Sequence, residues 1–376
     1  MKILEYHCRA LDQLAWDFDS VKFDNINLLV GDTATGKTRL LNTLFNLGRF
    51  VTVKEFKYGS WNIVFEHAGI TYTWDLQTNS QDSDGEERIV KENLSKHENQ
   101  TLVPIIERND KSFVFADRQM PKLSSRETSI SLLQEEDNIR PLYQGFSRIQ
   151  RRLFSEDALM QVSTFQVLPK RVISQVGTKG DLEKLFVADM NLSCKLCILS
   201  RHFKKVYQVI IDYFRQVFPF VQEHSIKELS EIQPNIALGG YCPVFTIRER
   251  GSKQWIPIHE FSSGMKKILL ILTDIFILPD GGVYIIDEYE NSLGISAIDF
   301  FPQFILDLEK NVQFFITSHH PYIINAIPPS NWFVFHRNGM KVSIRYGEDL
   351  IRRFESSKQE YFIQLINDPF FSRGVE

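Results

Sequence analysis

The stretch GDTATGKT, residues 31–38, decides the fold of this chain. Gly31 is followed after four residues by Gly36, Lys37 and Thr38, which is the spacing of a P-loop. Glycines allow successive backbone N–H groups to point at one anion, and the following helix adds the positive end of its dipole. The spacing therefore predicts a phosphate site in which Lys37 reaches the β- and γ-phosphates and the Thr38 hydroxyl binds magnesium.

The residues on either side of this loop have the context that the motif requires. Residues 26–30, INLLV, predict a buried strand, and residues 39–45, RLLNTLF, predict the start of an amphipathic helix. Strand, glycine loop and helix in this order indicate nucleotide binding. The residues expected to bind the nucleotide here are Gly31, Asp32, Thr33, Ala34, Thr35, Gly36, Lys37, Thr38 and Arg39.

Composition limits the class of protein. The chain has 376 residues, with 43% apolar and 24% charged residues, as in ordinary globular domains. A net charge of −4 excludes a strongly basic protein but leaves room for a local basic face. The chain contains no run of about 18 apolar residues, so the sequence predicts no membrane helix. The first residues also lack the apolar core of a signal peptide. We therefore expect a cytoplasmic protein without a membrane partner, whose four cysteines are reduced thiols.

The patterns along the chain predict an α/β protein in three parts. Residues 1–128 form the N-terminal part of a head with the P-loop and a β subdomain, residues 129–225 form a helical lobe, and residues 226–376 complete the head. In the first part, residues 61–76 predict a hairpin that turns at Ala68-Gly69. The polar residues 77–100 predict a surface loop.

Two further features concern the later parts of the chain. Asn338-Gly339 predicts a hairpin turn between two late strands. Two groups of basic residues in the helical part have spacings that share a helix face, which suits either nucleic acid phosphates or a solvated surface. The groups are Arg148, Arg151 and Arg152, and then Arg201, Lys204 and Lys205.

Asp287 and Glu288 are the strongest catalytic candidates. They follow residues 283–286, VYII, which predict a buried strand. Ligands collect at the carboxyl ends of parallel strands, so one carboxylate is placed to order magnesium and the other to deprotonate an attacking water. Two acidic residues that simply cap a strand end remain the alternative for this motif alone.

Two more motifs suit phosphate chemistry. Residues 261–267, FSSGMKK, open an apolar helix, and hydroxyls with free N–H groups at a helix N-terminus bind phosphate well, although a plain N-cap has the same pattern. His319 follows residues 312–316, VQFFI, which predict a buried strand, and a neutral imidazole there can hydrogen-bond a γ-phosphate oxygen. Alone, either motif has an ordinary structural explanation.

The order of the four motifs resembles that of ABC-type ATPases, specifically the SMC/RecF-like branch, and is similar to the overcoming-lysogenisation-type ATP-binding proteins of bacterial defence. The stretches that carry the resemblance are GDTATGKT, FSSGMKK, VYIIDEYENSLG and FFITSHHPYIINAIP. The resemblance implies an ABC-type P-loop head with an antiparallel β subdomain and a helical lobe. It also implies that two heads sandwich two ATP molecules with magnesium.

The resemblance assigns roles residue by residue. Glu288 would be the catalytic carboxylate, His319 the switch histidine and Lys37 a catalytic phosphate ligand. The signature residues Ser262, Ser263 and Gly264 of one subunit would contact the γ-phosphate held by the other. Magnesium would be held by Thr38, by Asp287 through water, and by Gln119 as the Q-loop residue.

The chain departs from the family in one loop. The family's loop after the catalytic carboxylate often reads Leu-His-Pro, whereas this chain has Ser292-Leu293-Gly294 in a region, Glu290 to Gly294, that would lie at the dimer interface. The stretch after His319 is also too short for the nuclease domain that many relatives carry. We therefore expect a separate effector chain, such as a nuclease or toxin.

The leading hypothesis is an ATPase that dimerises on ATP and acts as a switch gating that effector, in anti-phage defence. A non-hydrolysing scaffold or sensor that ATP stabilises is the first alternative. A RecF-like DNA repair clamp, with nucleic acid as a direct partner, is the second.

Overall fold

The computed structural model describes residues 1–81, 86–99, 101–152, 154–155, 158–160, 163–169, 179–236, 238–351 and 361–373. The chain divides into two compact units. The first unit comprises residues 1–152, 280–289 and 305–376, and the second comprises residues 153–279 and 290–304. The expected boundaries at 128/129 and 225/226 therefore differ from those of the structure.

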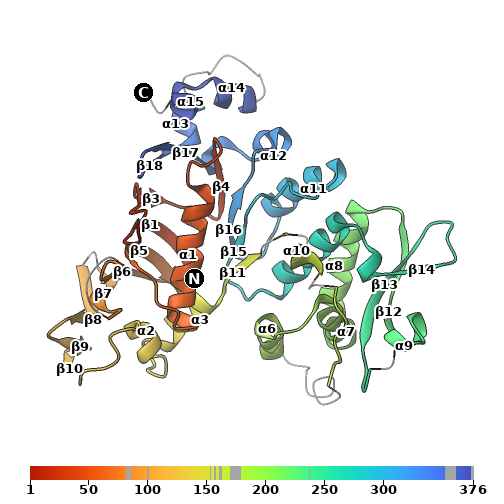
Figure 1. Cartoon of the computed structure of the whole chain (residues 1–376), viewed down its shortest axis with the longest axis horizontal. Coiled ribbons are helices and arrows are strands. Elements are labelled where there is room, and N and C mark those ends of the chain that lie inside the picture. The colour runs from red at the N-terminus through yellow and green to blue at the C-terminus, as the bar shows by residue number, and fades with distance from the viewer. Residues whose placement is uncertain are drawn as a thin grey trace. The chain divides into compact units, whose positions relative to one another are not determined.

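Within the described residues, the first unit is built on one sheet of 15 strands, and Figure 1 shows its course. Its strands are β1 (Lys2–Ala10), β2 (Asp17–Phe18), β3 (Val21–Lys22), β4 (Ile26–Gly31), β5 (Gly59–His67), β6 (Ile70–Thr78), β7 (Ile89–Glu98), β8 (Thr101–Asn109), β9 (Phe113–Phe115), β10 (Arg118–Gln119), β11 (Ile149–Arg152), β15 (Gly282–Ile286), β16 (Val312–Thr317), β17 (Trp332–Asn338) and β18 (Lys341–Tyr346). Its helices are α1 (Lys37–Thr52), α2 (Ser129–Leu132), α3 (Arg140–Ser147), α12 (Pro321–Ala326), α13 (Gly347–Ile351), α14 (Tyr361–Asn367) and α15 (Pro369–Arg373).

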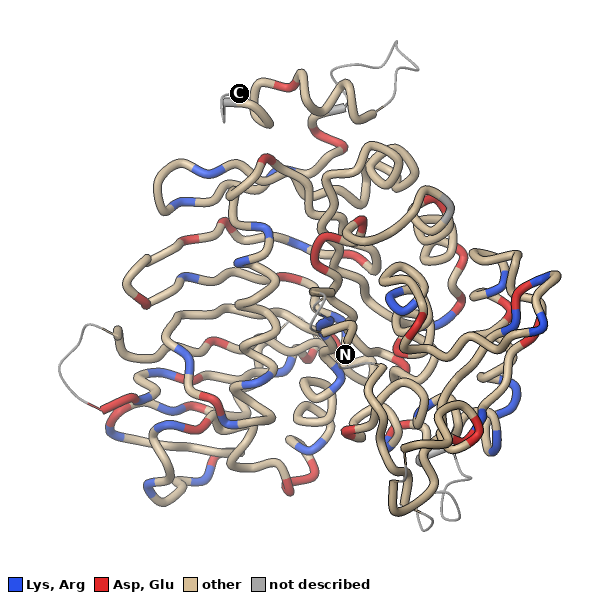
Figure 2. The backbone as a smooth tube through the Cα atoms, turned by 45° about the vertical axis from the view of Figure 1, so that its right-hand side comes forward, with Lys and Arg blue, Asp and Glu red and all other residues tan. Residues whose placement is uncertain are grey.

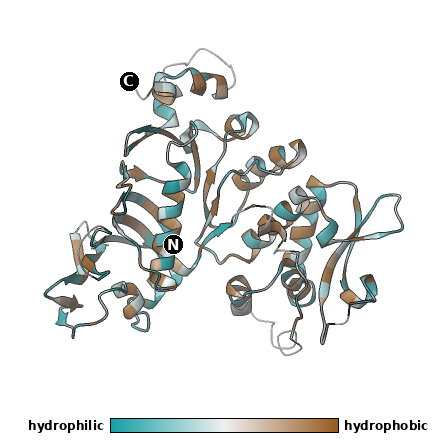
Figure 3. Ribbon diagram, in the orientation of Figure 1, coloured by the Kyte–Doolittle hydropathy of each residue, from teal (hydrophilic) through white to brown (hydrophobic). Residues whose placement is uncertain are grey.

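The parallel part of this sheet has the order β11-β15-β16-β4-β17. β15 and β16 are buried at every residue, which explains their largely apolar sequences (Figure 3). Helix α1 follows the P-loop directly and packs on β4, β16 and β11. All three polar segments that follow β4, β15 and β16 therefore leave the same edge of the sheet.

The antiparallel part of the sheet runs from β1 through β5, β6, β7 and β8 to β9 and β10. The predicted hairpins at Ala68-Gly69 and Asn338-Gly339 are both confirmed. The surface loop expected at 77–100 is wrong over residues 89–98, which form β7. Ile89, Glu92 and Leu94 of β7 are buried while the residues between them are more accessible, so a half-buried strand was mistaken for a polar loop.

The second unit combines helices with a small antiparallel sheet, β12-β13-β14. Helix α7 packs on β13, and Ser193 Oγ accepts a hydrogen bond from Phe245 N at 3.1 Å. Tyr213 lies against Phe276, Phe300 and Phe304, which joins the discontinuous segment 290–304 to the rest of the unit. The elements of this unit are α6 (Lys179–Val187), α7 (Leu192–His202), α8 (Lys204–Val217), β12 (Val221–Glu228), α9 (Leu229–Ile232), β13 (Pro243–Glu249), β14 (Trp255–Pro257), α10 (Ser263–Ile277) and most of α11 (Ile295–Leu306).

The structure also corrects the expected basic helix faces. Residues 149–152 form strand β11, so Arg148, Arg151 and Arg152 do not share a helix face. Arg201 belongs to α7, and the two lysines of the second group open a separate helix, α8. The four cysteines are buried free thiols, and no helix in the described part of the chain is both long and apolar enough to cross a membrane.

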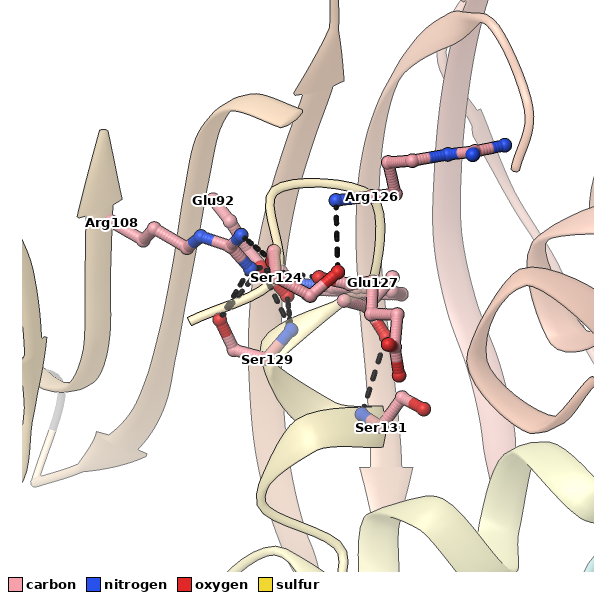
Figure 4. A network of polar contacts seen from close by, with 9 residues as sticks. Glu92, Arg108, Ser124, Arg126, Glu127, Ser129 and Ser131 are labelled. Atoms are coloured by element: carbon pink, nitrogen blue, oxygen red, sulfur yellow. Dashed lines mark hydrogen bonds and ion pairs between the residues drawn. The ribbon is translucent and has the colours of Figure 1, made fainter. Parts of the chain in front are cut away.

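A buried ion pair ties the antiparallel strands to helix α2 (Figure 4). Glu92 on β7 is fully buried and accepts hydrogen bonds from Ser129 N, Ser129 Oγ and Trp74 Nε1. Arg108 on β8 lies 3.4 Å from Glu92 Oε2 and also donates to the carbonyl of Glu127. Burial raises the pKa of Glu92, and the charge of Arg108 lowers it.

Replacing Arg108 with methionine is expected to reduce the free energy of unfolding by about 2 kcal/mol, because it leaves a buried carboxylate without its cation. The pKa of Glu92 then rises further, so the folded variant binds a proton at higher pH than the unfolded chain. The loss should therefore shrink as the pH falls from about 8 to about 5. Denaturant titrations at several pH values measure this loss in the free energy of unfolding. The control is Lys96→Met, which removes an exposed ion pair with Glu98. A loss that is the same at every pH would contradict this role.

Candidate functional site

The P-loop forms a closed turn around the side chain of Lys37. Lys37 Nζ donates to the carbonyl oxygens of Gly31 and Asp32, at 2.8 Å each, and the residue is buried. Gly36 has φ 102°, and a Cβ there would lie 2.7 Å from a ring carbon of Trp16. Position 36 therefore requires glycine for both its backbone and its space.

Asp287 lies at the end of β15 and joins three segments of the first unit. Its Oδ1 accepts hydrogen bonds from Thr38 Oγ1 at 3.1 Å and from Thr317 Oγ1 at 2.7 Å. Its Oδ2 lies 3.3 Å from Arg151 Nη2. Thr38 and Asp287, both predicted to hold magnesium, are thus brought together, and their hard oxygen donors suit that ion.

Glu288 is placed by the same threonine. The backbone N–H of Glu288 donates to Thr317 Oγ1 at 2.7 Å, and Glu288 has φ 49°, a left-handed conformation that is uncommon for a residue with a side chain. The side chain is exposed toward solvent, while Asp287 is mostly covered. Thr317 therefore contacts both acidic residues, the carboxylate of Asp287 and the backbone of Glu288.

The P-loop, Glu288 and Thr317 line one pocket of about 460 Å³ in the first unit. Glu288, Thr317 and His319 face the P-loop across it, so the structure brings Lys37, Thr38, Glu288 and His319 together as predicted. The lining residues are Trp16, Thr33, Ala34, Thr35, Gly36, Lys37, Thr38, Arg39, Asn42, Glu288, Thr317, His319 and Arg337.

Trp16 and Arg337, which also line this pocket, were not predicted from the sequence, whereas Arg39 was. The guanidinium carbons of Arg39 and Arg337 lie 5.0 Å and 4.9 Å from the ring centroid of Trp16, a cation–π contact in each case. Arg39 also pairs with Asp12 at 2.5 Å. No short motif contains Trp16 and Arg337, which lie far apart in the chain and meet only because β18 pairs with β2.

The signature residues belong to the second unit. Ser262 is the N-cap of α10, and its Oγ accepts from Met265 N at 3.2 Å. Ser262 and Ser263 are exposed, whereas Gly264 is buried and a Cβ there would lie 2.8 Å from the carbonyl oxygen of Ser292. Fully buried Lys267 donates to the carbonyl of Asn291 at 3.0 Å. The signature helix and the region 290–294 are therefore fixed to each other.

Gln119 is not brought to the phosphate pocket. It is exposed on β10, at the end of the antiparallel strands, and lines a different pocket with Arg88, Lys111 and Lys122. The expected metal role of Gln119 therefore has no support in the geometry. β15 lies between β16 and β11, and Arg151 of β11 is the residue that reaches Asp287.

Comparison with known proteins agrees with a P-loop ATPase of the ABC/AAA type. Residues 81–325, which are 245 of the 376 residues, match the family described as "AAA domain, putative AbiEii toxin, Type IV TA system". The chain belongs to this family. The matched range contains the signature residues, Asp287, Glu288 and His319, and it begins after the P-loop. No curated protein matches the chain.

Solved structures show the fold. A crystal structure of an SMC head bound to the C-winged helix domain of ScpA is 11% identical, with a TM-score of 0.51, and the match covers 92% of this chain and 97% of that chain. An SMC head domain from Thermotoga maritima is 13% identical, with a TM-score of 0.47, over 92% of this chain and 99% of that chain. The expected ABC-type head fold is confirmed by the first of these.

Proposed function

We propose that this protein binds and hydrolyses ATP as a switch of the SMC/RecF-like ABC class, similar to overcoming-lysogenisation-type ATPases. The observation that carries the proposal is the placement of Asp287 and Glu288 by one residue, Thr317, opposite the P-loop. One carboxylate is turned toward Thr38 and the other is exposed in the pocket. This division suits one metal ligand and one general base.

The residues of the pocket have distinct roles in this proposal. The backbone N–H groups of the P-loop and Lys37 bind the phosphates, and Thr38 with Asp287 holds magnesium. Bound magnesium neutralises charge on the phosphate oxygens. Glu288 accepts a proton from the attacking water, and His319 donates a hydrogen bond to the γ-phosphate.

In this proposal the exposed guanidinium of Arg337, which lies over the buried ring of Trp16, stacks against the base. Aromatic rings and guanidinium planes stack on bases of any sequence. Their contacts carry no pattern of donors and acceptors that is unique to adenine. The assignment of ATP therefore rests on the resemblance and on the family.

ATP is proposed to close a dimer through the signature residues. The exposed hydroxyls of Ser262 and Ser263 stand at the N-terminus of α10, a helix of 15 residues whose dipole favours anions. In the sandwich that the resemblance implies, these groups bind the γ-phosphate of the partner subunit. Hydrolysis would remove that contact and reopen the dimer.

The output of the switch is proposed to be a separate effector, a nuclease or toxin, in anti-phage defence. The family description names a toxin–antitoxin system. A similar head structure is bound to another protein, ScpA. Both findings support a partner chain, and the effector is proposed from the resemblance alone.

The two alternatives remain less supported. Figure 2 shows Lys and Arg interleaved with Asp and Glu along the antiparallel strands, where Lys96 pairs with Glu98 on β7, and Arg126 pairs with Glu87 in the adjoining loops. Arg151 is also engaged with Asp287. These pairings give the DNA clamp no specific support. The rate of ATP hydrolysis distinguishes the non-hydrolysing scaffold from the switch.

Lys37→Ala tests the proposal. It should weaken binding of a fluorescent ATP analogue by roughly ten- to a hundredfold, because a charged donor to the phosphates is lost. Equilibrium titration measures the affinity, and Lys111→Ala, at an exposed lysine distant in sequence from the P-loop motif, is the matched control. Equal affinity of Lys37→Ala and wild type would refute nucleotide binding at this loop.

A further inference from the structure

Arg151 lies on the strand beside the one that leads to Asp287. β11 pairs in parallel with β15, with Arg151 opposite Ile285 and Arg152 opposite Ile286. This register brings Arg151 to the end of β15, where the chain continues into Asp287. An arginine thus stands beside the carboxylate that is assigned to magnesium.

The contact is well shielded from water. Arg151 Nη2 lies 3.3 Å from Asp287 Oδ2, and the two side chains are 13% and 12% exposed. Salt and water screen such a pair weakly. Among the described residues, Arg151 Nε is buried without a hydrogen-bond partner. The guanidinium is therefore oriented largely by Asp287, rather than locked in place by further hydrogen bonds from Nε.

The two oxygens of Asp287 are used differently. Oδ1 accepts from Thr38 and Thr317, which fixes the carboxylate against the P-loop. Oδ2 faces Arg151. A divalent cation held by Thr38 and Asp287 would share this carboxylate with the guanidinium, and two cations on one carboxylate repel each other.

We propose that Arg151 is a positioning residue that responds to the metal. It neutralises Asp287 while no metal–nucleotide complex is bound, and it is driven off Oδ2 when a divalent cation arrives with the phosphates. This inference rests on the proposed function. In this proposal, Arg151 raises the concentration of Mg²⁺ that nucleotide binding requires.

Arg151 lies on the strand from which the chain leaves the first unit. Arg152 is the last residue of the first unit before the chain enters the second unit at residue 153. β11 is a strand of four residues at the edge of the sheet. A change in the Arg151 contact therefore acts on the strand from which the chain leaves the nucleotide-binding unit.

The test measures how much Mg²⁺ is needed for the protein to bind a fluorescent ATP analogue, starting from protein in EDTA. Arg151→Met keeps most of the side-chain bulk and removes the charge. It should lower the half-saturating Mg²⁺ concentration roughly tenfold, because the competing cation is gone. Arg151→Lys, which keeps the charge, should stay within about threefold of wild type.

Arg152→Met is the matched control, because successive residues of a strand point to opposite faces. It should leave the Mg²⁺ requirement unchanged. If Arg151→Met does not fold, Arg151→Gln replaces it, and the readout is the rise in melting temperature on adding Mg²⁺ at fixed nucleotide. That rise should exceed the wild-type rise.

The outcomes separate this inference from the proposed function. If wild type binds the analogue in a Lys37-dependent way and Arg151→Met needs as much Mg²⁺ as wild type, the inference is overturned and the proposed function stands. If wild type does not bind the analogue, both are overturned. A lower requirement in Arg151→Met, but not in Arg152→Met, supports the inference.

Discussion

Replacing Glu288 with glutamine is expected to lower the rate of ATP hydrolysis by roughly two to three orders of magnitude, the usual contribution of a general base. Glutamine has nearly the same size but accepts no proton from water. The backbone N–H at position 288 keeps its bond to Thr317, so the loop should hold its shape. Binding of the ATP analogue should change only a few-fold.

The same variant should trap the closed dimer. Light scattering on Glu288→Gln with and without ATP and Mg²⁺ measures the mass, and Glu107→Gln, the same change at an exposed site on β8, is the control. A shift from monomer to dimer only with ATP supports the switch. Turnover that is the same in wild type and Glu288→Gln would favour the non-hydrolysing scaffold instead.

A mixture of two inactive variants is expected to regain hydrolysis. Lys37→Ala removes the phosphate-binding lysine of the P-loop. Ser263→Arg places a bulky cation at the exposed start of α10. In a two-fold symmetric sandwich, each site combines the P-loop of one subunit with the signature of the other. Half of the dimers in an equal mixture are mixed and have one intact site, so activity should reach about a quarter of wild type.

The control for this mixture is Lys37→Ala combined with the double variant Lys37→Ala/Ser263→Arg. No dimer in that mixture has an intact P-loop, so its activity should stay at the level of Lys37→Ala alone. Melting curves establish that each variant folds. If the first mixture stays inactive while wild type hydrolyses ATP, the trans contact of the signature residues is wrong.

Local patterns carried much of the fold and of the phosphate site. The P-loop was predicted because its chemistry is contained in eight consecutive residues, and β15 because a fully buried parallel strand is an unbroken apolar run. Asp287 and His319 then followed from their places after such strands. The two hairpins were predicted for the same reason, since a tight turn depends on two adjacent residues.

Features that depend on distant residues were missed. β11 is a strand because it pairs with β15, over a hundred residues later, and its arginines looked helical when taken alone. Thr317 was not singled out, yet its hydroxyl binds the Asp287 carboxylate and the backbone N–H of Glu288. Gln119 was chosen for following a strand, but that strand lies at the far end of the sheet from β15.

The order of strands in the sheet also determines when each strand can pair during synthesis. β4 is synthesised about 300 residues before its neighbours β16 and β17, and such long-range pairing slows folding. Until those strands are made, the largely apolar residues 26–30 have no partner on either edge of the strand. An unpaired apolar strand in a nascent chain is prone to aggregation. The residues of the P-loop are therefore synthesised long before the strands that flank β4 in the folded protein.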